Sequence, residues 1–218
     1  MKKWLITLAL FLPVATYAAG GGYNEHVVKA DINLRDNVSL QTGAKLYVNY
    51  CMGCHSLEFQ RYNRMSRDLG IPNELMMKHL NFTSDREGDQ MRIAMSYEDG
   101  ANWFGAYPPD LTMIARAKGP NWLYSYLISF YEDPSRPFGH NNYVYENVGM
   151  PHVMANLEAD LGEEQFRAAM LDLTNFMTYV AEPVRLERER LGVYVLLFLG
   201  ILFIPAYLLK KEYWKDIK

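Results

Sequence analysis

Three stretches of the sequence place apolar residues at the spacing of an amphipathic α-helix. The first leads up to Cys51, and Asp31 and Ser39 are the candidate residues for its N-terminal cap. The other two helices are predicted over residues 121–131, directly after a proline, and over residues 163–180. Few stretches alternate apolar and polar residues as a half-exposed strand does. The pattern therefore predicts a mainly α-helical chain.

The last of these helices has the most regular apolar stripe. Its members recur close to every 3.6 residues: Phe166, Ala169, Met170, Leu173, Phe176, Met177 and Val180. Pro183 follows and is expected to close the helix. Between Tyr131 and Pro151 the density of Pro, Gly, Asn and Tyr is high, which predicts a long ordered loop rather than a helix or strand.

An uncharged and mostly apolar run of 19 residues extends from Leu191 to Leu209. That length is sufficient to cross roughly 30 Å of hydrocarbon. Arg185, Arg188 and Arg190 precede the run, Lys210, Lys211 and Lys215 are among the residues that follow it, and a basic end favours the cytoplasmic side. We therefore expect a transmembrane anchor at residues 191–209 and a cytoplasmic tail at residues 210–218.

The N-terminus has the three parts of a secretory signal peptide. Lys2 and Lys3 supply positive charge, an apolar run follows from Trp4 to Val14, and small residues end at Ala18. We expect a signal peptide at residues 1–18 that is cleaved after Ala18; an uncleaved anchor is the alternative. Export then places the domain of residues 19–190 in the periplasm, on the outer face of a bacterial inner membrane.

The exported domain is acidic. It contains 16 Lys and Arg against 23 Asp and Glu, a formal charge of −7, whereas the whole chain carries −3. This balance argues against nucleic acid as a partner and is compatible with steering a cationic protein. Ordinary solubility explains the charge equally well. The densest acidic cluster, a candidate docking rim or simply a solvated helix start, is Glu158, Asp160, Glu163 and Glu164.

Cys51, Cys54 and His55 form the pattern Cys-x-x-Cys-His. It is the attachment signature of a c-type haem, in which each thiol adds to one vinyl group of the porphyrin and the histidine ligates the iron. A redox dithiol of the thioredoxin type is the rival interpretation, but that motif lacks the histidine and lies between a strand and a helix. No other cysteine exists in the 218 residues. We therefore expect one covalently attached haem c with His55 as an iron ligand.

The sixth ligand of the iron has several candidates among the twelve methionines and the four other histidines. Most methionines fit helical or apolar runs and are expected in the core. Met150 instead follows Gly149 and precedes Pro151 in the predicted loop, from which a ligand can reach across a haem. Its local rivals are Met154, His140 and His152. Residue type and loop position alone do not choose among them.

Four blocks of the sequence, taken in order, resemble the cytochrome c1 family, the haem-carrying subunits of the cytochrome bc1 complex. They are Gly43-Ala-Lys-Leu-Tyr47 with Tyr50-Cys-Met-Gly-Cys-His-Ser56; Pro108-Pro-Asp-Leu111 with Ile114 and Arg116; Gly149-Met150-Pro151; and Tyr179-Val-Ala-Glu-Pro183 before the apolar span. Many cytochromes share the haem motif, but the other three blocks narrow the resemblance. It covers essentially the whole mature chain.

The resemblance implies a class I cytochrome c-like haem domain with long loops and one C-terminal transmembrane helix. It implies one-electron transfer from the Rieske iron–sulfur subunit to a soluble or tethered cytochrome c, in a membrane complex with a cytochrome b subunit and without independent turnover. Met150 is then the sixth ligand, Pro109 packs near the haem, and Arg116 or Lys118 lies near a propionate. The family often has arginine where this chain has Lys118, which lacks the planar guanidinium fork. The segment 102–105 also matches the family less closely.

Two other classes of haem protein share the motif and the compartment. A periplasmic haem peroxidase needs an open or displaceable sixth position, which a permanent Met150 ligand closes. A membrane-tethered electron shuttle or an oxidase subunit shares haem and membrane anchor but lacks the cytochrome bc1 partners. The proteins that copurify with the chain distinguish these alternatives.

Overall fold

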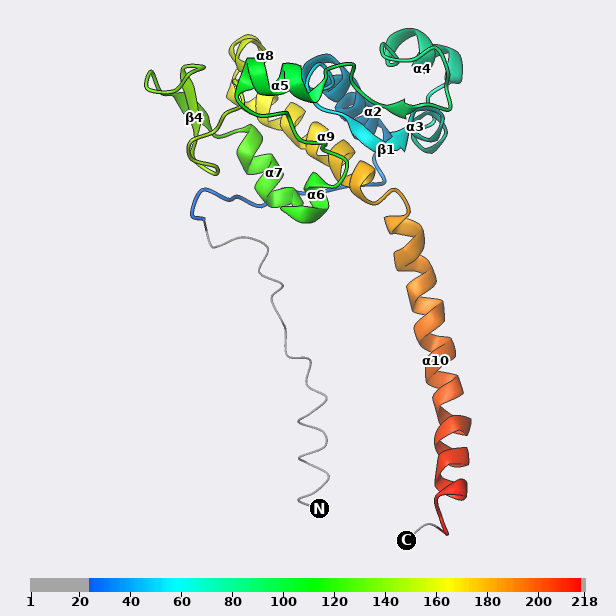
Figure 1. Ribbon diagram of the computed structural model, residues 1–218. Helices are drawn as coiled ribbons and strands as arrows, with labels where there is room; N and C mark the ends of the chain where they lie inside the picture. Colours follow the sequence, from blue (N-terminus) through cyan, green and yellow to red (C-terminus); the bar gives the residue numbers. More distant parts are fainter. Residues whose placement is uncertain (1–23, 217–218) are drawn as a thin grey trace.

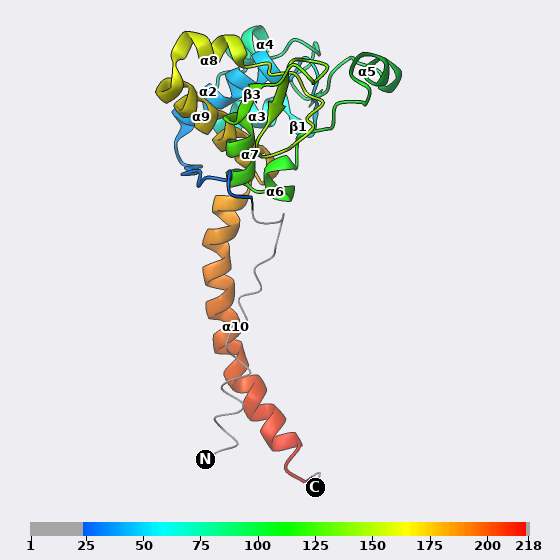
Figure 2. The ribbon, with the colours of Figure 1, turned by 90° about the vertical axis from the view of Figure 1, so that its left-hand side faces the viewer.

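The computed structural model describes residues 24–216. Within them one mainly helical domain stands at the end of a long helix, α10 (Arg185–Tyr213), as Figures 1 and 2 show. The other helices are α2 (Asn37–Leu46), η1 (Tyr47–Cys51), α3 (Tyr62–Leu69), α4 (Asn73–His79), α5 (Tyr97–Phe104), α6 (Ile114–Ala117), α7 (Pro120–Leu127), α8 (Ala155–Leu161) and α9 (Glu163–Ala181). The strands are β1 (Leu57–Arg61), β2 (Gln90–Met91), β3 (Phe130–Glu132) and β4 (His140–Asn142). They form two antiparallel pairs, β1 with β2 and β3 with β4.

The domain is built on the crossing of α2 and α9, two helices far apart in sequence. Gly43 allows this close approach. A Cβ placed on Gly43 would lie 2.6 Å from the Cβ of Phe176 and would also overlap the backbone oxygen of Asp172. Around the crossing, Leu40, Ala44 and Met170 are buried. Since η1 continues from α2, the crossing fixes the direction in which the chain enters the Cys51 motif.

The predicted caps of the first helix were wrong. Asp36 is the cap, and its carboxylate accepts hydrogen bonds from the backbone N–H groups of Val38 and Ser39. Ser39 lies inside the helix instead, and its hydroxyl donates to Asp172 at 2.6 Å. Asp31 lies in the extended segment that precedes the helix. The helix begins directly after Asp36, because the carboxylate of that residue is in position to accept from the free N–H groups of the first turn.

The second predicted helix was placed correctly at its start and extended too far at its end. Helix α7 ends at Leu127, and Phe130 belongs to strand β3 rather than to the apolar face of the helix. Strand β3 pairs with β4, with Phe130 opposite Asn142. The prediction of a loop throughout residues 131–151 was therefore wrong, because the hairpin of β3 and β4 occupies its first half. The remainder, including Met150, is irregular.

The third predicted helix is confirmed as α9, which ends one residue later than expected, two residues before Pro183. Its apolar stripe forms the centre of the core: Phe166, Met170, Leu173, Phe176, Met177 and Val180 are all buried. The methionines expected in the core at positions 65, 76 and 91 are buried as well. Helices α3, α4, α5, α6 and α8, each of eight residues or fewer, were not predicted individually.

Helix α10 has the length and composition of a membrane span. It covers 29 residues, and the mean hydropathy of its most apolar window is 2.4, with none of that window buried inside the structure. The helix contains the predicted span at residues 191–209 and runs through Pro205 without interruption. Figures 1 and 2 show it leaving the domain as a single rod. The predicted signal peptide lies outside the described residues.

Candidate functional site

Cys51, Cys54 and His55 lie on one tight turn at the end of η1. The N–H of Met52 donates to the carbonyl of Tyr47 at 2.9 Å and closes the helix. The carbonyl of Cys51 then accepts from the N–H groups of Cys54 at 3.1 Å and His55 at 2.9 Å. The backbone of the two cysteines and the histidine is therefore held by the same turn. Short π-helical segments such as η1 often occur at functional sites.

Both thiols are free in the described structure, with Cys51 buried and Cys54 partly exposed. Burial raises the pKa of the Cys51 thiol to about 12, and the neighbouring Cys54 contributes in the same direction. Burial also raises the pKa of Cys54. A reactive redox dithiol has the opposite property, a lowered thiol pKa. Neither thiol of this pair has that property.

The imidazole of His55 is buried and fixed in orientation. Its Nδ1 lies 2.7 Å from the backbone oxygen of Pro109. A carbonyl only accepts hydrogen bonds, so Nδ1 carries the proton and Nε2 keeps its lone pair for a metal. Burial lowers the pKa of His55, and the hydrogen bond to Pro109 and the charge of Asp110 oppose this in part. On the backbone side, the hydroxyl of Tyr47 donates to the carbonyl of His55 at 2.5 Å.

The segment that supplies the Pro109 carbonyl is itself tied to the attachment turn. The N–H of Leu111 donates to the carbonyl of Ser56 at 3.0 Å. The carboxylate of Asp110 accepts from the N–H of Glu58 at 2.8 Å and from that of Thr112 at 2.9 Å. The block Pro-Pro-Asp-Leu is thereby positioned against the turn by its aspartate and by its backbone. The carbonyl of Pro109 lies next to His55, and the packing of Pro109 near the haem stays a prediction.

Met150 belongs to a second cluster, formed by α7 and the residues after the β3–β4 hairpin. The hydroxyl of Tyr126 donates to the Sδ of Met150 at 3.3 Å. Arg136 fixes the chain just before Met150, because its guanidinium donates to the carbonyls of Asn147 at 2.8 Å and Val148 at 3.1 Å. Helix α9 packs against both α2, which leads to the attachment turn, and α7, which carries Tyr126. The two clusters therefore share one scaffold.

The three rivals of Met150 have other positions. Met154 is 2% exposed and belongs to the hydrophobic core. The ring of His152 stacks on Phe130 with centroids 4.6 Å apart, and His140 meets His152 at a steep angle. The Nε2 of His152 is buried without a hydrogen-bond partner in the described part of the chain, and a carboxylate oxygen of Glu158 lies 3.4 Å away. Among the four candidates, Met150 is the one whose thioether sulfur accepts a hydrogen bond from a side chain of α7, that of Tyr126.

The two predicted propionate partners lie on and just after α6, and they make different contacts. The guanidinium of Arg116, on an exposed side chain, lies 3.7 Å from the carboxylate of the largely covered Glu182. The ammonium of Lys118 lies over the ring of Trp122, 5.5 Å from its centroid. Neither side chain is fixed by a short hydrogen bond, and both remain near the N-terminal end of α7.

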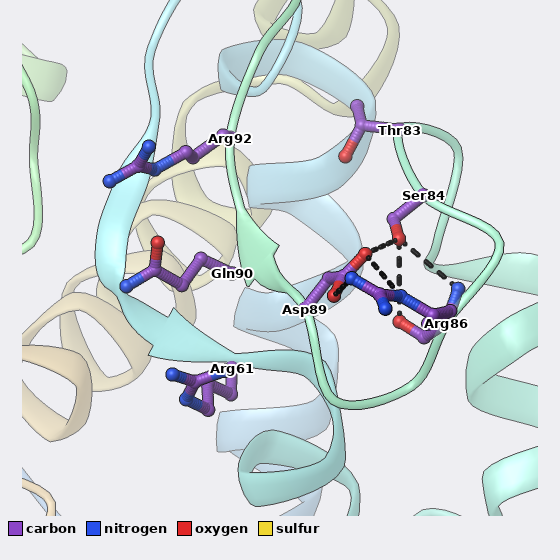
Figure 3. A pocket seen from close by; sticks show the side chains of 7 residues that line it. All are labelled: Arg61, Thr83, Ser84, Arg86, Asp89, Gln90 and Arg92. Carbon is purple, nitrogen blue, oxygen red and sulfur yellow. Dashed lines mark hydrogen bonds and ion pairs between the residues drawn. The ribbon is translucent and has the colours of Figure 1, made fainter.

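Two surface hollows lie away from these residues. One, of about 310 Å³, is shown in Figure 3 and is lined by Arg61, Thr83, Ser84, Arg86, Asp89, Gln90 and Arg92. The other, of about 330 Å³, lies where the domain meets α10. Neither contains any of the predicted site residues.

The donor set fits a c-type haem. It offers two unpaired thiols on one turn, an imidazole whose Nε2 is left free by its bond to Pro109, and a thioether in an irregular segment. These are the groups of a covalent haem with histidine and methionine ligation. Sequence reasoning missed Tyr126 as part of the site, because a tyrosine on the apolar face of a helix has the pattern of a core residue.

Comparison with known proteins agrees with the donor set. The model of the cytochrome C1 family matches residues 29–217. Cytochrome c1 of Allochromatium vinosum is 47% identical over 99% of both chains. A protein of Nitrosomonas europaea named ammonia monooxygenase gamma subunit is 38% identical over 100% of this chain and 99% of that protein. Cytochrome c1 of Rhodospirillum rubrum is 26% identical over 100% and 98%.

The match begins ahead of α2 and continues past the end of α10, so it includes the attachment turn, the segment behind His55, the Met150 loop and the apolar helix. The resemblance inferred from four sequence blocks is thereby confirmed. The chain belongs to the cytochrome c1 family, whose members carry covalent haem c and serve as the membrane-anchored electron-transfer subunit of the cytochrome bc1 complex.

Proposed function

We propose that this protein takes one electron at a time from a Rieske iron–sulfur subunit and passes it to a cytochrome c. The observation that carries the proposal is the 2.7 Å contact between His55 Nδ1 and the Pro109 oxygen, which leaves Nε2 available to iron directly beside two free thiols. Family membership supplies the setting, a complex with cytochrome b and the Rieske subunit.

In this proposal each site residue has one role. Cys51 and Cys54 would hold the haem through two thioether bonds, and His55 and Met150 would ligate its iron. Haem bound in this way supplies one-electron redox chemistry at a relatively high potential, as histidine and methionine ligation favours. Pro109 orients His55 through its carbonyl and packs beside the haem. Arg116 or Lys118 neutralises a propionate; the cation–π contact of Lys118 with Trp122 supports the second, because it keeps the ammonium near α7.

The proposed topology follows from the charge and the helices. A signal peptide at residues 1–18 is removed, residues 19–190 form the periplasmic haem domain, residues 191–209 span the inner membrane, and residues 210–218 stay in the cytoplasm. The apolar surface of α10 is exposed along its whole length. It therefore contacts membrane lipid and the helices of the cytochrome b subunit.

The alternatives differ in what they require of the sixth ligand and of the partners. A peroxidase needs a position open to peroxide, whereas the thioether of Met150 is tied to Tyr126 and its loop is fixed by Arg136. A tethered shuttle, an oxidase subunit, or a subunit of another oxidoreductase keeps the same ligands and differs in its partners. The name of the Nitrosomonas europaea relative makes the partner question worth settling directly.

Affinity purification of the full chain from its own membranes in mild detergent tests the partners. We expect a cytochrome b and a Rieske protein in stoichiometric amounts, together with quinol–cytochrome c reductase activity. Monooxygenase or oxidase subunits in place of these two would contradict the proposal. A preparation that contains only this chain would favour the shuttle.

Paired substitutions test the ligand. Met150→Leu is expected to keep haem attached, to abolish the absorption band of thioether-ligated oxidised haem, and to open the iron to carbon monoxide. Met154→Leu is the matched control, because it removes a thioether that lies in the core, four positions after Met150 in the sequence. If Met154→Leu abolished the band while Met150→Leu left it unchanged, the ligand assignment would be wrong.

A further inference from the structure

We propose that Tyr126 positions the Met150 thioether and raises the reduction potential of the site by donating a hydrogen bond to the sulfur. The inference rests on the proposed role of Met150 as an iron ligand. It assigns a role to a residue that the sequence marks only as part of an apolar helix face.

The contact is direct. The hydroxyl of Tyr126 lies 3.3 Å from the Sδ of Met150, within the range of a hydrogen bond to sulfur. A thioether sulfur is a weak acceptor with two lone pairs, and a metal uses only one of them. The sulfur can therefore ligate iron and accept from the hydroxyl at once. The two residues are 24 positions apart, so the bond also fixes the loop to α7.

The ring of Tyr126 is held from several sides. Trp122 stacks on it with centroids 5.2 Å apart and planes inclined by 9°, and Phe130 meets it edge-on at 5.3 Å. The backbone oxygen of Tyr126 accepts from the side-chain amide of Asn142 at 2.8 Å, and Asn142 is fully buried. With the ring and the backbone both fixed, the hydroxyl has a defined position. Such support from neighbouring groups is what makes a ligand-orienting hydrogen bond effective.

The hydroxyl acts as a donor. A thioether sulfur has no proton to give, so in this contact the tyrosine hydroxyl must donate. A protonated phenol has one O–H to donate, and Met150 Sδ is the partner it has in the described residues.

The expected effect on the reduction potential follows from how the hydrogen bond and the iron–sulfur bond each draw electron density from the sulfur. A hydrogen bond to sulfur withdraws electron density that the thioether otherwise donates to iron. The oxidised iron needs this donation more than the reduced iron does, so the bond favours the reduced state and raises the potential. It also keeps the sulfur aimed at the iron and slows its replacement by other ligands.

The test is Tyr126→Phe in the full chain within its membrane complex, with Tyr124→Phe as the matched control. Tyr124 is on the same helix and is partly buried, and its hydroxyl makes no hydrogen bond within residues 24–216. Tyr126→Phe is expected to keep covalent haem and the thioether band. A net hydrogen bond of ordinary strength predicts a roughly two- to tenfold shift of the electron equilibrium with a fixed redox partner towards the oxidised state. Carbon monoxide binding to the reduced protein should also rise, and Tyr124→Phe should change neither quantity.

Equal potentials and equal carbon monoxide binding in the two variants would overturn the inference, and the ligand assignment would stand if Met150→Leu still abolished the band. Retention of the band in Met150→Leu would instead overturn the assignment itself. If Tyr126→Phe accumulated no haem protein, the wild-type protein gives the same test by resonance Raman spectroscopy in H₂O and D₂O. Deuteration of the hydroxyl should shift the iron–sulfur vibration, and an unchanged vibration would overturn the inference.

Discussion

His55 and Pro109, 54 positions apart, are joined by a 2.7 Å contact between the imidazole Nδ1 and a backbone oxygen. The contact explains why a proline-rich block accompanies the attachment motif. A proline carbonyl in a segment tied down by Asp110 is a rigid acceptor, and it fixes both the tautomer and the plane of the histidine. His55 is therefore oriented by a loop that is distant in the sequence, and the helical periodicity of the sequence does not indicate this contact.

The first prediction concerns covalent attachment. Cys51→Ala and Cys54→Ala should each lose one thioether bond and retain the other, because the turn that presents them remains closed by backbone hydrogen bonds. The double variant should contain no covalent haem. Haem staining of denaturing gels and intact-protein mass spectrometry measure this directly, and covalent haem in the double variant would refute the proposed attachment.

The second prediction concerns the helix crossing. Gly43→Ala forces a methyl group into Phe176 and the backbone of Asp172, so α2 and α9 must separate. We expect a loss of about 1–3 kcal/mol in the free energy of unfolding, even though alanine is the better helix former. Gly88→Ala is the control, since its Cβ would meet nothing closer than 4.0 Å. Equal denaturation midpoints for the two variants would show that the crossing tolerates a methyl group.

The elements that could be predicted from sequence are those whose apolar pattern extends over a long stretch of the chain. Helix α9 and the apolar helix were identified because their stripe and run extend over many turns. The end of α7 and the β3–β4 hairpin were missed, because strand pairing between Phe130 and Asn142 overrides a short apolar face. The cap at Asp36 was missed because Asp31 and Ser39 are equally good capping types, and only backbone geometry separates them.

The third prediction concerns topology. A chain ending at Arg190 should be released as a water-soluble domain that still carries haem, because the core around α2 and α9 lies entirely before α10. It should support little quinol–cytochrome c reductase turnover. The N-terminal sequence of the mature full-length protein should begin at Ala19. Detection of an intact Met1 would refute cleavage, and a truncated chain that remained in the membrane would refute a sole C-terminal anchor.

The fourth prediction concerns the acidic charge of residues 19–190. If that charge steers a basic cytochrome c, electron delivery should slow several-fold between roughly 0.01 M and 0.1 M salt, as the Debye length falls from about 30 Å to about 10 Å. Electron entry from the Rieske subunit should change less. A rate of delivery that is constant or rises with salt would contradict steering and would favour an apolar docking surface or a tethered acceptor.

Most of the candidate site could be predicted from the sequence and the family resemblance. The spacing of Cys51, Cys54 and His55 is fixed by the chemistry of attachment, so it is visible without a structure. Met150 could be proposed from its loop and from the family resemblance. Tyr126 could not, because its role depends on a contact with a residue 24 positions away that no local pattern encodes.

The most direct test of the account is a single-turnover stopped-flow experiment on the purified membrane complex. Quinol is added to the oxidised complex, and the absorbance of this chain's haem is followed before and after addition of oxidised cytochrome c. The account predicts reduction of the chain by quinol, loss of that reduction when the Rieske subunit is removed, and rapid reoxidation by cytochrome c. Quinol oxidation that leaves the chain oxidised, or reduction of the chain that is unaffected by removal of the Rieske subunit, would contradict it.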